Sequence, residues 1–193
     1  MKTQLLISFL AAVILTACYS KQECRGFETE KAFVDFYPIR SITPTLSFKN
    51  ELGETVVFEL TEETKTEAQI IKCRDKCPCP PAELKLNYYS AELGTNLGFL
   101  GFYDEYGSHT NGSHAVVLND IVYAWGGQDI ESTEGIDGFY TLYVHADTIL
   151  GEVYNHIARI EAYPGLDTMT FWVQKDSGLI AFEWEESTYL SVD

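Results

Sequence analysis

Cysteine side chains are the residues whose type and spacing bear most directly on chemistry in this chain. Four of the five cysteines are Cys24, Cys73, Cys77 and Cys79, and the last three share one short segment. Four thiolates held together would suit zinc or copper, whereas four oxidised cysteines would form two disulfides. The spacing departs from the paired Cys-x-x-Cys knuckles of structural zinc sites, and the chain has no Cys-x-x-Cys redox motif and no Cys-x-x-Cys-His haem motif. The choice between the two chemistries therefore depends on the compartment.

The N-terminal segment indicates that compartment. A short positively charged start precedes an apolar run from Leu5 to Leu15, which is too short to cross a bilayer and is typical of a secretory signal. The following residues complete the sequence Leu15-Thr16-Ala17-Cys18, which resembles the bacterial lipobox. The resemblance implies a lipoprotein signal peptide over residues 1–17 and acyl chains such as palmitate on Cys18. It also implies a membrane anchor at the mature N-terminus.

Secretion favours disulfides for the four remaining cysteines. A bridge between Cys77 and Cys79 is the least favoured, because a single intervening residue strains its geometry. Cys24 is then expected to pair within the segment 73–79, and the second bridge closes a small loop inside that segment. The long bridge encloses roughly 50 residues and by chain entropy contributes about 4 kcal/mol. The metal site remains the alternative.

One long stretch of the chain carries acidic residues but no basic ones. Residues 86–158 contain ten acids and neither Lys nor Arg. Carboxylate oxygens at this density are the ligands that Ca²⁺ prefers. The candidate ligands lie between Gly126 and Gly138, and they are Asp129, Glu131, Glu134 and Asp137. Their spacing does not fit the EF-hand register, so a solvated acidic loop is favoured over a calcium site.

The histidines do not predict a catalytic centre. His109 and His114 are expected to bracket a loop over residues 108–113, and His145 and His156 fall in strand-like runs. Ser113 precedes His114, but the chain has no Gly-x-Ser-x-Gly elbow and no His-Glu-x-x-His helix. The sequence therefore predicts a protein that is not an enzyme and implies no cofactor.

Composition places the chain among single-domain folded proteins. It has 193 residues, of which 46% are hydrophobic and 13% aromatic, enough apolar area to bury a core. With 13 Lys plus Arg against 29 Asp plus Glu, the net charge is -16. Such a charge argues against a nucleic-acid partner and predicts that the domain stands off from anionic membrane surfaces.

The mature chain is predicted to be all-β. Short runs rich in Val, Ile, Tyr, Phe and Thr are separated by Gly, Asn and Asp, and the connections have hairpin length. The predicted strands are 33–36, 46–48, 56–60, 68–72, 84–89, 97–103, 115–125, 139–144, 153–163, 169–174 and 179–184. They favour a single antiparallel β-sandwich or curled partial-barrel domain over residues 31–193, after a lipid-anchored tether over residues 18–30. A brief helix within residues 21–34 is the only other expected element.

The last third of the chain carries a second resemblance. The segments Asp147–Ile157 and Thr170–Glu183 resemble the C-terminal pattern of uncharacterised Bacteroidota lipoproteins, in which a strand precedes an aromatic hairpin. In that hairpin Phe171 and Val173 should face inward, and residues 176–178 should turn the chain. The resemblance implies an outer-membrane lipoprotein and a fold, but no activity and neither the periplasmic nor the surface face.

Two functional hypotheses follow. The first is a non-catalytic envelope lipoprotein that binds or assembles a protein or glycan partner. The second is a carrier that holds a hydrophobic ligand or a metal in a half-open β-barrel. The aromatic residues fit a core best, but a cavity lining or an exposed rim would also use them.

Overall fold

The computed structural model describes residues 20–24, 26–27, 38–39, 41–73, 79–106, 109–118, 121–126, 139–162 and 169–192. Every regular element in these ranges is a β-strand and every strand pairing is antiparallel, which confirms the all-β prediction. Over this part of the chain, no helix has the length and apolarity needed to span a bilayer. The signal peptide and the four calcium candidates lie outside the described residues.

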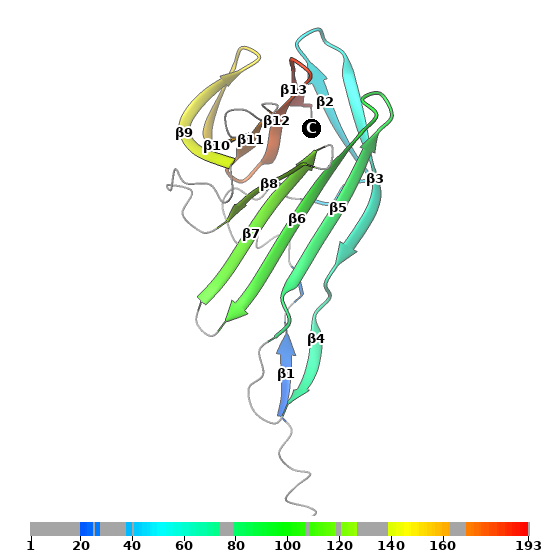
Figure 1. Cartoon of the computed structure of the whole chain (residues 1–193), viewed down its shortest axis with the longest axis vertical. Helices are drawn as coiled ribbons and strands as arrows, with labels where there is room; N and C mark the ends of the chain where they lie inside the picture. Colours follow the sequence, from blue (N-terminus) through cyan, green and yellow to red (C-terminus); the bar gives the residue numbers. More distant parts are fainter. Residues whose placement is uncertain are drawn as a thin grey trace, which may run out of the picture.

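The strands form one large sheet and one two-stranded ribbon (Figure 1). The ribbon pairs β1 (Ser20–Cys24) with β4 (Gln69–Cys73). The strands of the large sheet are, in chain order, β2 (Thr45–Asn50), β3 (Thr55–Lys65), β5 (Ala82–Ser90), β6 (Thr95–Tyr106), β7 (His109–Leu118), β8 (Ile121–Gly126), β9 (Phe139–Ile149), β10 (Glu152–Ala162), β11 (Thr170–Gln174), β12 (Gly178–Trp184) and β13 (Ser187–Ser191). Their spatial order is β8-β7-β6-β5-β3-β2-β13-β12-β11-β10-β9.

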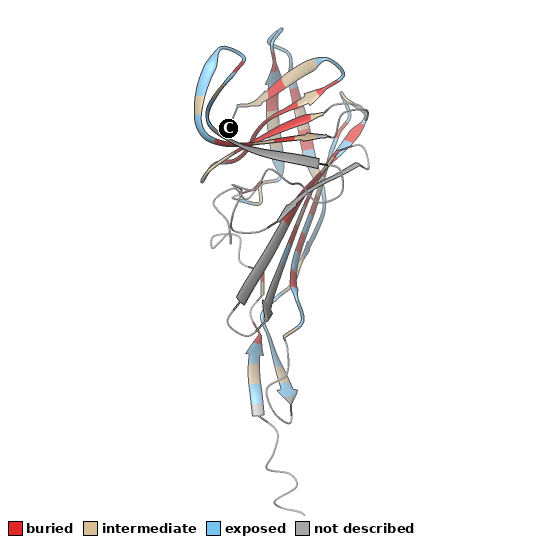
Figure 2. Ribbon diagram, turned by 60° about the vertical axis from the view of Figure 1, so that its left-hand side comes forward, coloured by how far each residue is buried: buried red, intermediate tan, exposed pale blue. Residues whose placement is uncertain are grey.

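The large sheet curls so that its two halves face each other. One arm is formed by β2, β3, β5, β6, β7 and β8. The other is formed by β9 to β13 and crosses over the upper part of the first (Figures 1 and 2). β2 and β13 pair at the bend, whereas the edge strands β8 and β9 are not hydrogen-bonded to each other. The architecture is therefore a curled, open sheet, the partial-barrel form of the predicted fold.

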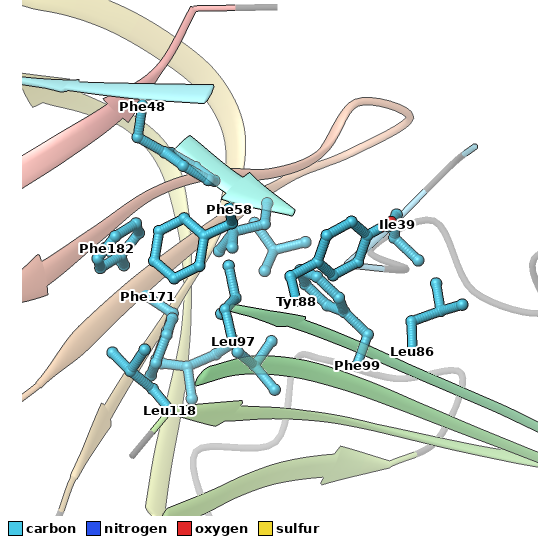
Figure 3. Packing of buried hydrophobic residues seen from close by; sticks show 14 of the residues in the cluster. Ile39, Phe48, Phe58, Leu86, Tyr88, Leu97, Phe99, Leu118, Phe171 and Phe182 are labelled. Carbon is cyan, nitrogen blue, oxygen red and sulfur yellow. The ribbon is translucent and has the colours of Figure 1, made fainter. Parts of the chain in front are cut away.

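Strand alternation places the core between the arms. Along β5, Leu84, Leu86 and Tyr88 are buried, while the residues between them are exposed or half-buried. Aromatic rings from both arms meet in this space, with Phe182 of β12 lying 5.0 Å from Phe48 of β2 between ring centroids (Figure 3). Edge-to-face contacts of this kind add to the hydrophobic stabilisation and hold the two arms together.

A second apolar cluster covers the outer face of the C-terminal arm. Trp172 is buried there rather than exposed, so β11 is buried on both faces, in contrast to the single inward face expected for this hairpin. The cause is the β9–β10 hairpin, whose residues pack on that outer face. The cluster comprises Ile149, Ile157, Trp172, Ile180 and Ala181, with Tyr154 and Leu190 packed against it.

Part of the N-terminal segment that the sequence predicted as a tether has regular structure. Residues 21–24, expected as the start of a short helix, belong to β1, because they pair with β4. Phe27 follows, with its side chain in the core and its backbone N–H donating to the Thr66 carbonyl at 2.9 Å. Gly26 permits this approach, since a Cβ there would lie 2.6 Å from the Ala68 nitrogen. Part of the expected tether is thus structured.

Candidate binding cleft

The structure places two of the four predicted cysteines in a disulfide. Cys24 at the end of β1 bonds to Cys79, with a Cα–Cα distance of 5.5 Å. This is one of the two pairings expected for Cys24, and it excludes a bridge between Cys77 and Cys79. Cys73 ends β4, and Cys77 lies outside the described residues. The prediction of a second bridge between these two remains a prediction.

The histidines take positions that differ from the expected loop. His109 and His114 both belong to β7, so the segment expected as a loop between them is largely strand. The His114 side chain is buried. His145 and His156 lie side by side on the β9–β10 hairpin, with ring centroids 5.7 Å apart. Within the described ranges, no group of three or more His, Cys, Asp or Glu side chains is placed to hold a metal ion.

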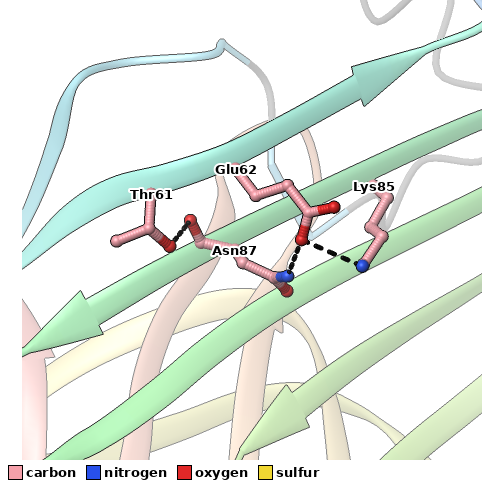
Figure 4. Close-up of polar contacts among 4 residues, drawn as sticks. All are labelled: Thr61, Glu62, Lys85 and Asn87. Atoms are coloured by element: carbon pink, nitrogen blue, oxygen red, sulfur yellow. Dashed lines mark hydrogen bonds and ion pairs between the residues drawn. The ribbon is translucent and has the colours of Figure 1, made fainter.

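A carboxylate–lysine network on the outer face of β3 and β5 has a structural explanation. The pairing of these strands shifts register between Leu60 and Glu62, and the Thr61 hydroxyl donates to the Asn87 carbonyl at 3.0 Å. Glu62 accepts from Lys85 at 2.9 Å and from the Asn87 amide (Figure 4). The Lys85 hydrogen bond, followed by that of Asn87, lowers the pKa of Glu62. An ionised, paired carboxylate fixes the bulge and is unsuited to general-acid work.

A cleft of about 700 Å³ lies between three chain segments that are distant in sequence. One wall is the β2–β3 turn, the other is the β9–β10 turn, and residues at the end of β13 complete the lining. These turns lie at the top of Figure 1, whereas β1 and β4 lie at the bottom. The lining residues are Lys49, Asn50, Glu51, Leu52, Gly53, Leu150, Glu152, Tyr154, Leu190, Ser191 and Val192. We call this the distal cleft.

Asn50 organises the first wall. Its buried side-chain oxygen accepts from the backbone N–H groups of Leu52 at 3.1 Å and Glu54 at 2.9 Å, and its amide donates to the Glu54 carboxylate at 2.9 Å. Gly53 closes the turn at a φ of 86°, a left-handed conformation that glycine adopts without strain. Glu51 accepts from the Thr188 N–H, which ties the turn to β13. These hydrogen bonds therefore hold the wall in place.

The second wall is held by polar contacts beneath the β9–β10 turn. Trp172 donates from its indole nitrogen to the Asp147 carboxylate at 3.0 Å, which fixes β9 over the outer face of β11. Tyr154 donates to the Glu152 carboxylate at 2.8 Å. Burial, then this hydrogen bond and the negative charge of Glu152, raise the pKa of Tyr154 to about 12. The phenol is thus a stable donor that keeps the Glu152 carboxylate beside the cleft.

Exposed aliphatic side chains gather around the distal cleft. Leu52 is 76% exposed, Val192 51% and Leu150 39%, and Val153, next to the lining residue Glu152, is 67% exposed. The other large apolar side chains with comparable exposure in the described residues are Ile70, Tyr89 and Phe102, on separate strands. Apolar side chains that cluster on rigid turns, instead of being buried, are typical of interaction sites.

The charge around the distal cleft is negative. Lys49 is its lining cation, against the carboxylates of Glu51 and Glu152. Nearby, burial raises the pKa of Tyr189, and the charges of Glu54, Glu51 and Glu185 raise it further. The β9–β10 turn carries no cation, because residues 86–158 contain neither Lys nor Arg. Sequence reasoning did not identify this site; its signal was an apolar residue inside each turn, Leu52 in the β2–β3 turn and Leu150 in the β9–β10 turn.

Comparison of the chain with protein-family models, with curated proteins and with solved structures found no match.

Proposed function

We propose that this protein is a non-catalytic outer-membrane lipoprotein, anchored through Cys18, that binds a protein partner in the distal cleft. The observation that carries the proposal is the gathering of exposed aliphatic side chains around a rigid cleft. The cleft lies at the opposite end of the molecule from β1, which begins two residues after Cys18. An N-terminal anchor would therefore hold the cleft away from the membrane.

The lining favours a protein partner over a glycan. Sugar rings are commonly bound on exposed aromatic faces, whereas the exposed side chains here are the aliphatic Leu52, Leu150 and Val192. Tyr154 is the aromatic residue of the lining, and its hydroxyl is engaged with Glu152. Aliphatic surface is matched best by apolar side chains of another protein, which bury it from water.

The packing between the arms favours binding on the outside over carriage of a ligand within. Phe58 contacts both Phe48 and Phe182 with centroids 5.9 Å apart, and Tyr189 stacks on Phe182 at 5.2 Å. Rings at these distances fill the space around them. The carrier hypothesis, in contrast, needs an open apolar space between the arms.

The anchor is tested by the intact mass of the chain recovered from the envelope of a cell that expresses it with its own N-terminal segment. We expect a chain that begins at Cys18 and carries the mass of a diacylglycerol and an N-acyl group. Substitution Cys18→Ser should leave the signal uncleaved at this site and abolish the added mass. Recovery of a chain that begins at Cys18 without lipid would contradict the proposal.

The cleft is tested by a photo-crosslinking amino acid placed at Leu52 of the full chain in living cells. We expect a discrete protein adduct, which mass spectrometry identifies. The matched control carries the same amino acid at Ile70, which is 62% exposed on β4 in the ribbon. Substitution Leu150→Asp on the opposite wall should suppress the adduct at Leu52. Equal adducts at both positions, or none at Leu52, would refute the proposed site.

A further inference from the structure

We propose that the occupant of the distal cleft is a short extended segment of a partner protein in which aliphatic side chains alternate with Lys or Arg. This inference rests on the proposed function and specifies the chemistry of the partner. It combines the charge of the cleft, the kind of apolar side chain at its rim and the rigidity of its walls.

Charge selects a basic segment. The carboxylates of Glu51 and Glu152 stand on opposite walls and outnumber the lining cation Lys49, so a segment lying between the walls passes anions on both sides. Tyr154 and the backbone of Thr188 hold these carboxylates in place through hydrogen bonds. A Lys or Arg side chain can join the same carboxylates, because an ionised carboxylate accepts several hydrogen bonds. Complementary charge also speeds association, and an acidic segment is repelled.

The apolar residues select aliphatic anchors. Leu52 belongs to one wall and Leu150 to the other, while Leu190, in β13, also lines the cleft. An aliphatic side chain inserted between them would bury its own surface and part of all three. A volume of about 700 Å³ accommodates a few side chains rather than a folded domain. Alternation along an extended segment presents the aliphatic anchors to the cleft on one face. The long Lys or Arg side chains start from the other face and can bend back to the exposed carboxylates of Glu51 and Glu152.

The walls are built to bind without rearrangement. Asn50 holds the β2–β3 turn through three hydrogen bonds, and the indole of Trp172 holds the β9 strand. Binding then costs little ordering of the cleft itself, which preserves affinity in a small interface. A second copy of this chain is a poor occupant, because each copy carries a net charge of -16 and would bring like charge to the cleft.

The test uses three end-capped, fluorescently labelled hexapeptides titrated into the full chain, purified as the cell processes it. One peptide alternates Lys and Leu, one alternates Glu and Leu, and one alternates Lys and Ser. Anisotropy at low salt should show the Lys/Leu peptide binding at least about tenfold more tightly than either of the others. Its affinity should fall as salt rises, since exposed charge pairs are screened.

Variants locate the binding. Glu51→Gln keeps the acceptor for the Thr188 N–H but removes the charge, and Leu52→Ser removes the apolar side chain that would contact the anchor. Each substitution should lower the affinity for the Lys/Leu peptide by about threefold to tenfold. The matched controls are Glu23→Gln and Ile70→Ser, cross-strand neighbours in the β1–β4 ribbon, and they should leave the affinity unchanged.

The outcomes separate this inference from the proposed function. Equal affinity for the three peptides, or equal effects of the cleft and ribbon variants, would overturn the inference that the occupant alternates aliphatic and basic residues. If the Leu52 adduct in cells nevertheless persists and depends on Leu150, the cleft still binds a protein, and only the partner chemistry is wrong. If that adduct is absent, the proposed function itself fails.

Discussion

Removal of the Cys24–Cys79 disulfide should destabilise the fold by about 4 kcal/mol. The bridge joins residues separated by 55 positions, and a loop of that length lowers the entropy of the unfolded chain by an amount worth about 4 kcal/mol at room temperature. The change is the double substitution Cys24→Ala and Cys79→Ala, which leaves no unpaired thiol from this bridge. The effect should exceed that of most single core substitutions.

The assay is urea unfolding followed by tryptophan fluorescence, because Trp172 and Trp184 are buried in the C-terminal arm. With a slope of about 2 kcal/mol per molar urea, the midpoint should fall by about 2 M. The matched control is Cys73→Ala with Cys77→Ala. A bridge between these residues would close a far shorter loop, and its loss should cost only about 2 kcal/mol.

Two results would refute this reasoning. A midpoint shift below about 0.5 M for the Cys24 and Cys79 variant, with an unchanged slope, would show that the bridge does not constrain the unfolded chain as its loop length requires. A larger loss from the Cys73 and Cys77 variant would show that the cysteine segment stabilises the fold through other contacts.

Three further perturbations test the fold around the cleft. Phe182→Ala should cost about 3–5 kcal/mol by removing the ring that joins Phe48 and Tyr189, while Phe182→Leu should cost clearly less; equal costs in urea unfolding would contradict the packing. Because the folded pKa of Tyr154 is raised from 10 to about 12, the unfolded chain loses its proton first, and stability should fall as the pH rises from 10 to 12. Tyr154→Phe should make that fall shallower. An unchanged slope of stability against pH would contradict the raised pKa of Tyr154. Gly26→Ala should cost about 1–3 kcal/mol and expose residues near the disulfide to limited proteolysis, because its Cβ would meet the Thr66 oxygen at 2.6 Å; wild-type stability would exclude the close approach.

Most strands could be predicted because local composition decides them. The strands on either side of the β2–β3 turn were predicted, and so was the turn after β11, where Asp176 and Gly178 both adopt positive φ. The run expected over residues 115–125 is instead two paired strands, β7 and β8, since the chain reverses between Leu118 and Ile121. Short β-rich runs do not reveal by themselves where a reversal falls.

Two strands could not be predicted because distant partners create them. β1 exists through its pairing with β4, and β13 lies between its hairpin neighbour β12 and β2, which is far away in the chain. Neither segment has a long apolar alternation of its own. The strand structure of β1 comes from its single ladder with β4, and that of β13 from its ladders with β12 and β2; a local pattern does not contain these pairings.

The distal cleft could not be predicted from the sequence for the same reason. Its walls come from residues near 50, 150 and 190, and only the curl of the sheet brings them together. The outer cluster at Trp172 likewise depends on the β9–β10 hairpin folding back, which includes a residue in the left-handed region at His156. Sequence spacing narrowed the disulfide partner of Cys24 to Cys77 or Cys79, because a bridge between those two residues would be strained.

The measurement that tests the central claim most directly is the dissociation constant between the full chain and the partner identified by the Leu52 adduct. We expect Leu52→Ser to weaken binding by about tenfold or more and Ile70→Ser, at the opposite end of the molecule, to leave the constant unchanged. Equal dissociation constants for the wild-type chain and the Leu52 variant would contradict binding at the distal cleft.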